Sequence, residues 1–332
     1  MRAIVQEGYG SSGVFRLTDI DRPEIEPDEV LIEVRAAGID RGTWHLMAGT
    51  PYALRLAFGL RRPSNPVPGL DVAGTVAAVG ADVTRFAVGD EVLGIAKGSF
   101  AEFAAAKVSK LVPKPAGLGF EAAAVVAVSG LTAIQGLRDV GRLVSGQRVL
   151  VLGAPGGVGS YALQLAKADA AEVTAVCGAT KVDLVRSLGA DHVIDYSMID
   201  PLDGGQRYDL ILDAGGDSGL RRLRRCLRPK GTLVIVGGER GKWIGIGRHL
   251  RAAAWSPLLS QRLKFFVSKE RFEDLEALCS LVESGQVTPA LDRTEPRLGF
   301  QMRVAVNSLA ILEREVRLGP AADAREHERL AR

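Results

Sequence analysis

The stretch from Val149 to Gly159, which reads VLVLGAPGGVG, constrains the fold of this chain more than any other segment. Its first four residues are apolar and partly β-branched, which is typical of a buried parallel strand. A turn with four glycines follows: Gly153, Gly156, Gly157 and Gly159. Residues 160–167 then carry apolar side chains at helical spacing. A strand, a glycine turn and a helix in this order present backbone N–H groups to a phosphate group, although glycine turns without a ligand are also common.

The first part of the chain has the pattern of an antiparallel, β-rich domain. Its length of 332 residues predicts two domains in all. Short strand-like segments lie at residues 2–5, 15–17, 29–36, 71–79, 87–94, 99–106 and 110–113, with turns between them. They predict a small, partly open barrel. Residues 40–66 form a longer loop or short helix among these strands, and long loops on a rigid scaffold often carry function.

After residue 120, strands and helices alternate. Helices are predicted at residues 121–128, 131–143, 182–188 and 220–227, and strands at 172–177, 189–196, 208–213 and 232–236. This alternation predicts βαβ units and a parallel sheet, and therefore an α/β fold for the chain. The glycine turn follows the first strand of the series. The context favours a dinucleotide site, with contacts expected at Gly153, Gly156, Gly157, Val158 and Gly159.

Composition excludes several classes of protein. The net charge is only +3, from 42 basic and 39 acidic residues, which argues against nucleic acid as the main partner. Cys177, Cys226 and Cys279 lie far apart, so they predict neither a zinc cluster nor a disulfide framework and suit a reducing cytoplasm. The N-terminus lacks a signal-peptide pattern, and no apolar run reaches the ~18 residues of a membrane span. We therefore predict a cytoplasmic protein without an integral membrane segment, acting on a small molecule.

The end of the second parallel strand indicates which dinucleotide would bind. An acidic residue there would hold the ribose 2′-hydroxyl of NAD, but the sequence continues as Gly178, Ala179, Thr180 and Lys181. Small residues leave room for a 2′-phosphate, and the lysine would complement its charge, so we predict NADP(H). The alternative is that Thr180 and Lys181 only begin a helix. Tyr196 ends the next strand and would contact the adenosine end, or would otherwise be a surface tyrosine.

Several motifs in order resemble the medium-chain dehydrogenase/reductase superfamily. They read GLDVAGTV at residues 69–76, VGDEV at 88–92 and SGLTA at 129–133, followed by the glycine turn. The resemblance covers about residues 1–295. It implies a GroES-like catalytic domain of residues 1–120 and 265–332, and a doubly wound Rossmann domain of residues 121–264 that binds NADP. In this superfamily the active site lies between the two domains, and a homodimer is the expected assembly.

The positions of two catalytic zinc ligands of the superfamily carry neither the cysteine nor the histidine. Zinc-dependent relatives have a cysteine and a histidine where this sequence has Asp40 and Leu70, and leucine cannot bind a metal. The lobe that holds a structural zinc is also missing, because residues 94–100 run on directly. His45 lies nearby, but a lone histidine in a loop is more often structural. The chain therefore resembles the zinc-free, quinone oxidoreductase-like branch, and no metal site is expected.

This resemblance implies hydride transfer from NADPH to an activated acceptor. Without a Lewis acid, a quinone or an α,β-unsaturated carbonyl is reduced more easily than a simple ketone. Tyr52 is the candidate for cofactor contact or proton donation, and Asp40 and Thr43 could line the same pocket. Asp40 could equally well cap a helix or a turn. Alternatives of the same fold are an alcohol/aldehyde or an enoyl-thioester oxidoreductase, and an alternative of another class is a non-catalytic NADP-binding redox sensor.

The resemblance also assigns further cofactor contacts. Ser129 and Thr132 would lie near the nicotinamide ribose, and Phe266 would approach the nicotinamide unless it packs in the core. Four residues would border the cofactor crevice after their strands: Ala214, Val236, Gly237 and Gly238. Trp243 and Trp255 lie in a basic segment that could contact a membrane surface or a dimer edge. The residues after Gly299 lack the closing strand of the family, so we expect the catalytic domain to lack one edge strand.

Overall fold

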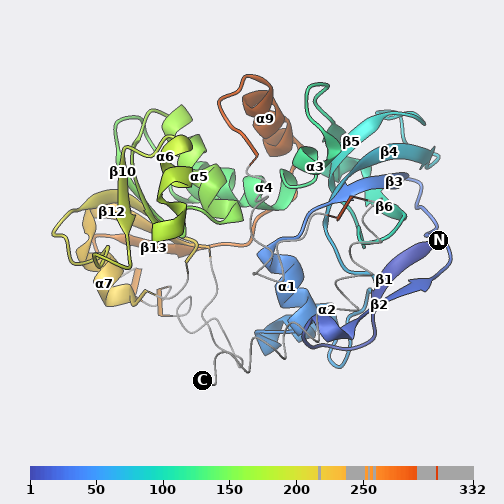
Figure 1. The fold of residues 1–332 in the computed structure, drawn as a ribbon, viewed down its shortest axis with the longest axis horizontal. Helices are drawn as coiled ribbons and strands as arrows, with labels where there is room; N and C mark the ends of the chain where they lie inside the picture. The colour runs from blue at the N-terminus through green and yellow to red at the C-terminus, as the bar shows by residue number, and fades with distance from the viewer. Residues whose placement is uncertain (216–217, 237–250, 253–254, 257–258, 290–303, 306–332) are drawn as a thin grey trace. The chain divides into compact units, whose positions relative to one another are not determined.

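The computed structural model describes residues 1–215, 218–236, 251–252, 255–256, 259–289 and 304–305 (Figure 1). The chain divides into two compact units. The first comprises Met1–Val128 with Leu291–Arg332, and the second comprises Ser129–Ala290. Residues 265–290, which we expected in the catalytic domain, group with the second unit. Residues 262–265 pair with residues 232–235 of this unit, and the Lys269 carbonyl accepts a hydrogen bond from Gln135 Nε2 at 2.7 Å.

The first unit is built on an antiparallel sheet with the strand order β14-β3-β4-β5-β7, and β6 pairs with the other part of β3. Its strands are β3 (Glu29–Ala37), β4 (Asp71–Val79), β5 (Glu91–Ile95), β6 (Phe103–Lys107) and β7 (Leu111–Pro113). β1 (Arg2–Gln6) and β2 (Phe15–Asp19) form a separate antiparallel pair. Alternate residues of these strands point inward, so Val30, Ile32 and Val34 are fully buried. The predicted β-rich half is confirmed.

Residues 40–66 of this unit contain short helices up to Phe58, followed by a loop. They contain α1 (Arg41–Ala48), the 3₁₀ turn η2 (Tyr52–Leu54) and α2 (Arg55–Phe58). Gly49 ends α1 in the left-handed conformation at φ +60°, which glycine adopts without strain. The chain then turns toward η2 through Pro51. This segment carries the catalytic candidates Tyr52, Asp40 and Thr43.

The second unit is a parallel sheet with the strand order β10-β9-β8-β11-β12-β13. The strands are β8 (Arg148–Leu152), β9 (Glu172–Cys177), β10 (His192–Asp195), β11 (Tyr208–Asp213), β12 (Leu227–Ile235) and β13 (Arg262–Phe265). Helices α5 (Gly157–Ala168), α6 (Val182–Ser187), α7 (Leu220–Arg225) and α9 (Phe272–Glu283) belong to the same unit. Val149, Leu150 and Val151 of β8 have no exposed surface, as expected for a strand covered on both faces. The predicted doubly wound parallel sheet is confirmed.

The strand order of the second unit reverses at β8. The chain proceeds from β8 to β9 and β10 on one side, and from β11 to β13 on the other. In open parallel sheets, ligands bind at the carboxyl ends of the strands where the order reverses. The glycine turn directly follows β8, so it stands at this position.

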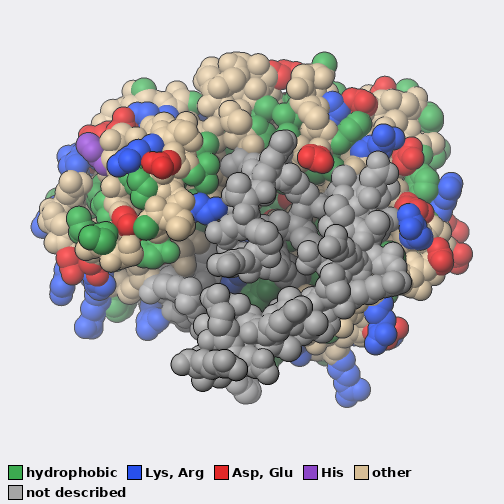
Figure 2. All heavy atoms as spheres, in the orientation of Figure 1, with side chains coloured by type: hydrophobic (Ala, Val, Ile, Leu, Met, Phe, Trp, Pro, Cys, Tyr) green, Lys and Arg blue, Asp and Glu red, His purple; other side chains and the backbone are tan. Residues whose placement is uncertain are grey.

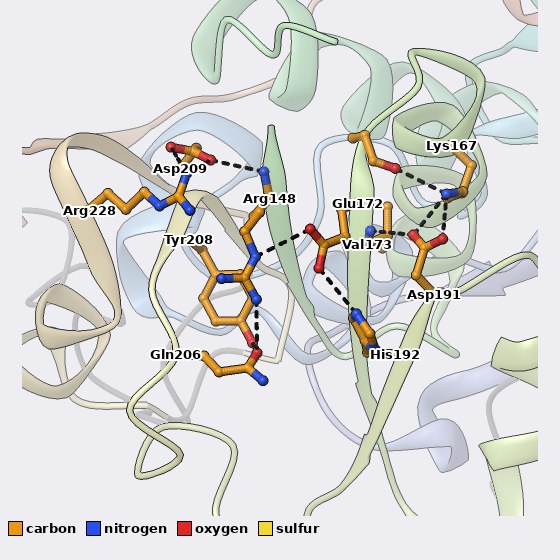
Figure 3. Close-up of polar contacts among 11 residues, drawn as sticks. Arg148, Lys167, Glu172, Val173, Asp191, His192, Gln206, Tyr208, Asp209 and Arg228 are labelled. Carbon is orange, nitrogen blue, oxygen red and sulfur yellow. Dashed lines mark hydrogen bonds and ion pairs between the residues drawn. The ribbon is translucent and has the colours of Figure 1, made fainter. Parts of the chain in front are cut away.

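Ion pairs join the amino ends of the strands, at the end of the sheet opposite to the glycine turn (Figure 3). Glu172, at the start of β9, contacts Arg148 of β8 at 3.4 Å and His192 of β10 at 3.1 Å. Lys167 Nζ lies 2.8 Å from Asp191, whose carboxylate also accepts the Val173 N–H at 2.7 Å. Exposed pairs of this kind contribute about 0–1 kcal/mol each. They hold the amino ends of neighbouring strands together and leave the carboxyl edge for a ligand.

Two helices expected from the sequence are divided differently in the structure. The predicted helix 121–128 ends after α3 (Phe120–Ala123), and α4 (Ala127–Gln135) begins after a turn. The chain continues with a π-helical segment, Gly136–Val140, where helix 131–143 was expected. The break has a specific partner, because Asp71 Oδ1 accepts the Val128 N–H at 2.8 Å, in the first turn of α4. A distant carboxylate can therefore start a helix that local sequence does not mark.

The C-terminal part contributes one described element. β14 (Val304–Ala305) pairs antiparallel with Ala36 and Ala37 at the edge of the first sheet. The expectation that the residues after Gly299 give the catalytic domain no edge strand is corrected for residues 304–305, which pair at the edge of this sheet; residues 306–332 lie outside the described residues. In the part of the chain that the structure describes, no helix is long and apolar enough to cross a membrane. On the described part of the face shown in Figure 2, acidic and basic side chains are mixed, in keeping with the nearly balanced charge.

Candidate functional site

The glycine turn is tightly packed between β8 and α5. Gly153 has φ +75°, and Gly156 N–H donates to its carbonyl oxygen at 3.1 Å. A β-carbon on Gly159 would lie 2.1 Å from the same oxygen, far inside van der Waals contact. Only glycine allows the first turn of α5 to approach the strand end so closely. The turn therefore fixes the direction in which the helix N-terminus points.

The N-terminus of α5 suits a pyrophosphate. Its first N–H groups have no acceptor within the helix, and the aligned peptide dipoles favour a negative charge there. Gly157 is exposed and Val158 is half-buried. Ser129 Oγ lies 2.7 Å from the place that a β-carbon of Gly157 would occupy, so this hydroxyl lies beside the turn. A side chain at Gly157 would fill that space, which is consistent with a cradle for a ligand.

The ends of β9 and β10 form the adjoining part of the candidate site. A β-carbon on Gly178 would lie 2.9 Å from the Tyr196 hydroxyl, so the structure brings these two residues together. Thr180 and Lys181 follow in a 3₁₀ turn, Ala179–Lys181. The Asp195 carboxylate is nearby but accepts the Ser197 N–H and hydroxyl at 2.9 and 2.7 Å. The tip of β9 and the end of β10 thus carry a hydroxyl, a cation and a phenol, which are groups that suit a phosphate.

The remaining cofactor candidates lie in several different places. Ala214 lies beside the glycine turn, since its N–H donates to Leu152 at 3.1 Å, and Val236 N–H donates to Asp213 at 3.0 Å. Gly237 and Gly238 lie outside the described residues. Thr132 Oγ1 and Ser268 Oγ are 3.2 Å apart. The Phe266 ring lies 3.4 Å from the place that a β-carbon on Gly136 would occupy, which corresponds to the packing role weighed for it.

Asp40 and Thr43 form the N-terminal cap of α1. Asp40 Oδ1 accepts the Thr43 N–H at 3.0 Å, and Oδ2 accepts the Thr43 hydroxyl at 2.9 Å. Both oxygens are thus used within the cap, and Thr43 is fully buried. His45 Nδ1 donates to the Thr50 carbonyl at 2.7 Å, and burial lowers the pKa of this imidazole. These contacts make Asp40 the N-cap of α1 and join His45 to the backbone after the helix. Direct roles of Asp40 and Thr43 in a reaction stay predictions.

Tyr52 is held by an arginine that sequence reasoning did not single out. The Arg55 guanidinium carbon lies 4.6 Å from the centre of the Tyr52 ring and 4.4 Å from that of Tyr9. Arg55 Nε also donates to the Gly49 carbonyl at 2.8 Å. Tyr52 is 38% exposed, so its ring is accessible at the surface of the first unit. The sequence gives only a weak signal for this stack of Arg55 between two tyrosines, because Tyr9 lies far from Tyr52 and Arg55 along the chain.

Asp71 is a second residue that sequence reasoning missed. It is 2% exposed, and its carboxylate accepts the Val128 N–H. Burial raises the pKa of this carboxyl well above its ordinary value, and the charge of Asp40 raises it further. The motif GLDVAG at residues 69–74 contained the residue, but nothing local predicts that its partner is a helix 57 positions away.

Comparison with known proteins decides the family. A model described as the alcohol dehydrogenase GroES-like domain matches residues 26–116, and one described as zinc-binding dehydrogenase matches residues 157–281. The "Quinone-oxidoreductase homolog, chloroplastic" of Spinacia oleracea is 36% identical, over 89% of this chain and 91% of that protein. The chain belongs to the quinone oxidoreductase-like branch of the medium-chain dehydrogenase/reductase superfamily.

Two further relatives extend the comparison of this quinone oxidoreductase-like chain. The "NADPH-dependent alkenal/one oxidoreductase, chloroplastic" of Arabidopsis thaliana is 34% identical, over 89% of this chain and 73% of that protein. The solved structure of a mycobacterial protein complexed with NADPH has a TM-score of 0.74 and 28% identity, and covers 88% of this chain and 91% of its own. Because these relatives include chloroplast proteins, the cytoplasmic location stays a prediction.

The quinone oxidoreductase-like chain carries a third match at its end. A model described as "Domain of unknown function (DUF6285)" matches residues 292–332. These are the residues that depart from the superfamily pattern after residue 295. The end of the chain therefore resembles a different family, whereas the sequence motifs alone showed only that it departs from the superfamily pattern.

Proposed function

We propose that the chain is a zinc-independent, NADPH-dependent reductase that transfers hydride to a quinone or an α,β-unsaturated carbonyl. One observation supports the zinc-independent part of this proposal. Asp40 stands where zinc-dependent relatives have a cysteine ligand, and both its oxygens are used by Thr43, while Leu70 replaces the histidine ligand. Among the described residues there is also no group of three or more His, Cys, Asp or Glu placed to hold a metal ion.

Residues of the second unit would hold the cofactor. The N-terminus of α5 and the turn Gly153–Gly159 would bind the pyrophosphate, with Ser129 beside them. Thr180, Lys181 and Tyr196 would surround the 2′-phosphate. Support for NADP(H) comes from the absence of an acid in residues 178–182 and from the NADPH complex of the mycobacterial relative. When bound, the reduced nicotinamide supplies the hydride.

The acceptor gains a hydride and a proton in the complete reaction. A quinone would become a hydroquinone, and an enone would take the hydride at its β-carbon and the proton at its α-carbon. Without a Lewis acid to polarise a simple carbonyl, these electron-poor acceptors are favoured. Tyr52 is the proposed proton donor or cofactor contact, with solvent as the alternative source of the proton. The names of the spinach and Arabidopsis relatives support both acceptor classes.

Initial rates with three acceptor classes test this proposal. We expect NADPH oxidation with a soluble benzoquinone or an enone, and no NADP reduction with a primary alcohol. The rates should not change after exhaustive treatment with a chelator or after addition of zinc. Alcohol oxidation that needs zinc would contradict the proposal. NADPH binding without turnover of any acceptor would instead favour the non-catalytic redox sensor.

A further inference from the structure

Three apolar side chains protrude close together from the first unit. Leu56 is 80% exposed, Phe58 is 43% exposed and Leu60 is 68% exposed. They lie within five residues, on α2 and the residues after it. We refer to Leu56, Phe58, Leu60, Arg61 and Arg62 as the apolar–arginine loop. Single exposed leucines are ordinary, but a gathered set in one loop indicates a contact surface.

The loop is held in place by its own hydrogen bonds. Gly59 N–H donates to the Arg55 carbonyl at 3.0 Å, and Ser64 N–H donates to the Phe58 carbonyl at 2.7 Å. The Tyr9 hydroxyl donates to the Gly59 carbonyl, which ties the loop to the segment that follows β1. A backbone with these bonds presents the apolar side chains to solvent as part of its fold. The loop backbone is therefore hydrogen-bonded within the first unit while these side chains are exposed.

The positive charge of the residues around this loop favours one kind of binding partner for it. Residues 41–70 contain four arginines and no aspartate or glutamate. Arg41 and Arg55 lie over aromatic rings, whereas Arg61 and Arg62 are exposed beside the leucines. Apolar side chains that enter the acyl boundary, next to arginines that meet phosphates, are the combination that binds an anionic lipid surface.

A second exposed apolar pair has the opposite surroundings. Met198 and Ile199 of the second unit are 80% and 64% exposed. They follow Asp195 and precede Asp200 and Asp203, so an anionic surface would repel them. The two apolar sites therefore differ in charge and not in exposure. This difference supplies a matched control within the same chain.

We propose that the apolar–arginine loop docks the protein on an anionic lipid bilayer. The leucines and the phenylalanine would enter the interface, while Arg61 and Arg62 would contact lipid phosphates. The inference does not depend on the proposed reaction, because it uses a surface and not the cofactor site. It predicts a peripheral, salt-sensitive association.

Flotation with lipid vesicles tests the proposal. The full chain should float with vesicles of phosphatidylcholine and phosphatidylserine, should float far less with phosphatidylcholine alone, and should be released by salt. Arg61→Gln/Arg62→Gln should weaken partitioning about 25-fold, at about fivefold per arginine. Leu56→Ser/Phe58→Ser/Leu60→Ser should abolish it, and Met198→Ser/Ile199→Ser should leave it unchanged.

Controls keep the result interpretable. Thermal unfolding and NADPH binding of each variant report whether the fold is retained. If Leu56→Ser/Phe58→Ser/Leu60→Ser unfolds, the proposal is tested with Arg61→Gln/Arg62→Gln, whose substituted side chains are exposed. Absence of flotation with anionic vesicles, or flotation that both loop variants retain, would overturn the proposal. A smaller sedimentation coefficient for the triple variant than for the unchanged protein would also overturn it, because the loop would then join two copies of the chain.

Discussion

At the scale of single residues, neighbours decide what a side chain does. Asp40 occupies the place of a metal ligand in related enzymes, yet its two oxygens bind the Thr43 N–H and hydroxyl. Lys181 is a candidate for the 2′-phosphate because residues 178–182, at the tip of β9, contain a lysine and no acidic residue. Both assignments are open to substitution experiments in which a structural role and a functional role give different results.

Replacing Asp40 separates capping from catalysis. Asp40→Ala should lower the free energy of unfolding by about 1 kcal/mol because α1 loses its cap. Asp40→Ser should restore most of that stability, since serine also caps helices. Denaturant unfolding measures both changes. If NADPH-dependent turnover is lost in Asp40→Ser while stability is retained, Asp40 acts in the reaction and the capping role is not sufficient.

Replacing Lys181 tests the 2′-phosphate site. Lys181→Ala should weaken NADPH binding about tenfold, because one charge-assisted contact is lost, and should leave NADH binding nearly unchanged. Titration of both nucleotides against the two proteins provides the measurement. Lys167→Ala is a suitable control, since this lysine pairs with Asp191 at the other edge of the sheet. Equal loss for NADPH and NADH would show that Lys181 only supports the fold.

At the scale of secondary-structure elements, two helix starts shape the molecule. The start of α5 depends on glycines that are adjacent in sequence, so the sequence predicts it. The start of α4 depends on Asp71, 57 residues earlier, so the sequence does not. The same distinction explains why the β8–α5 unit and the strand series were predictable, whereas the break after α3 and the Tyr9–Arg55–Tyr52 stack were not.

Gly159→Ala tests the tight turn. The added methyl group would clash with the Gly153 carbonyl oxygen at 2.1 Å. We expect a loss of about 2–3 kcal/mol in the free energy of unfolding and at least about tenfold weaker NADPH binding. Gly204→Ala is the matched control, because its β-carbon would meet no atom within 4 Å. Wild-type NADPH affinity in Gly159→Ala would contradict the proposed role of the turn.

Asp71→Asn tests the buried carboxyl through pH. Burial raises the pKa of Asp71 in the folded protein, so its contribution to stability is fully present below the unfolded value of 3.8 and is lost as pH rises above it. An asparagine can still accept the Val128 N–H but does not ionise. The free energy of unfolding of the unchanged protein should therefore fall relative to Asp71→Asn as pH rises from 3.8. Parallel pH profiles would contradict the assignment.

At the scale of the whole molecule, the chain joins parts with different relationships to known families. Residues 26–116 and 157–281 match the two domains of the superfamily, and residues 292–332 match a domain of unknown function. The sequence indicated the departure at the C-terminus but could not describe it, because a missing pattern carries no information about what replaces it. The homodimer suggested by the resemblance stays a prediction that sedimentation equilibrium can test.

The central claim is that bound NADPH reduces a quinone or an enone without a metal ion. A single-turnover experiment tests it most directly. The chelator-treated protein is mixed with one equivalent of NADPH and then with an excess of a soluble quinone or enone, and the nicotinamide absorbance is followed. The account predicts stoichiometric loss of the reduced nicotinamide, at the same rate with and without added zinc. Oxidation of NADPH that appears only when zinc is returned would contradict it.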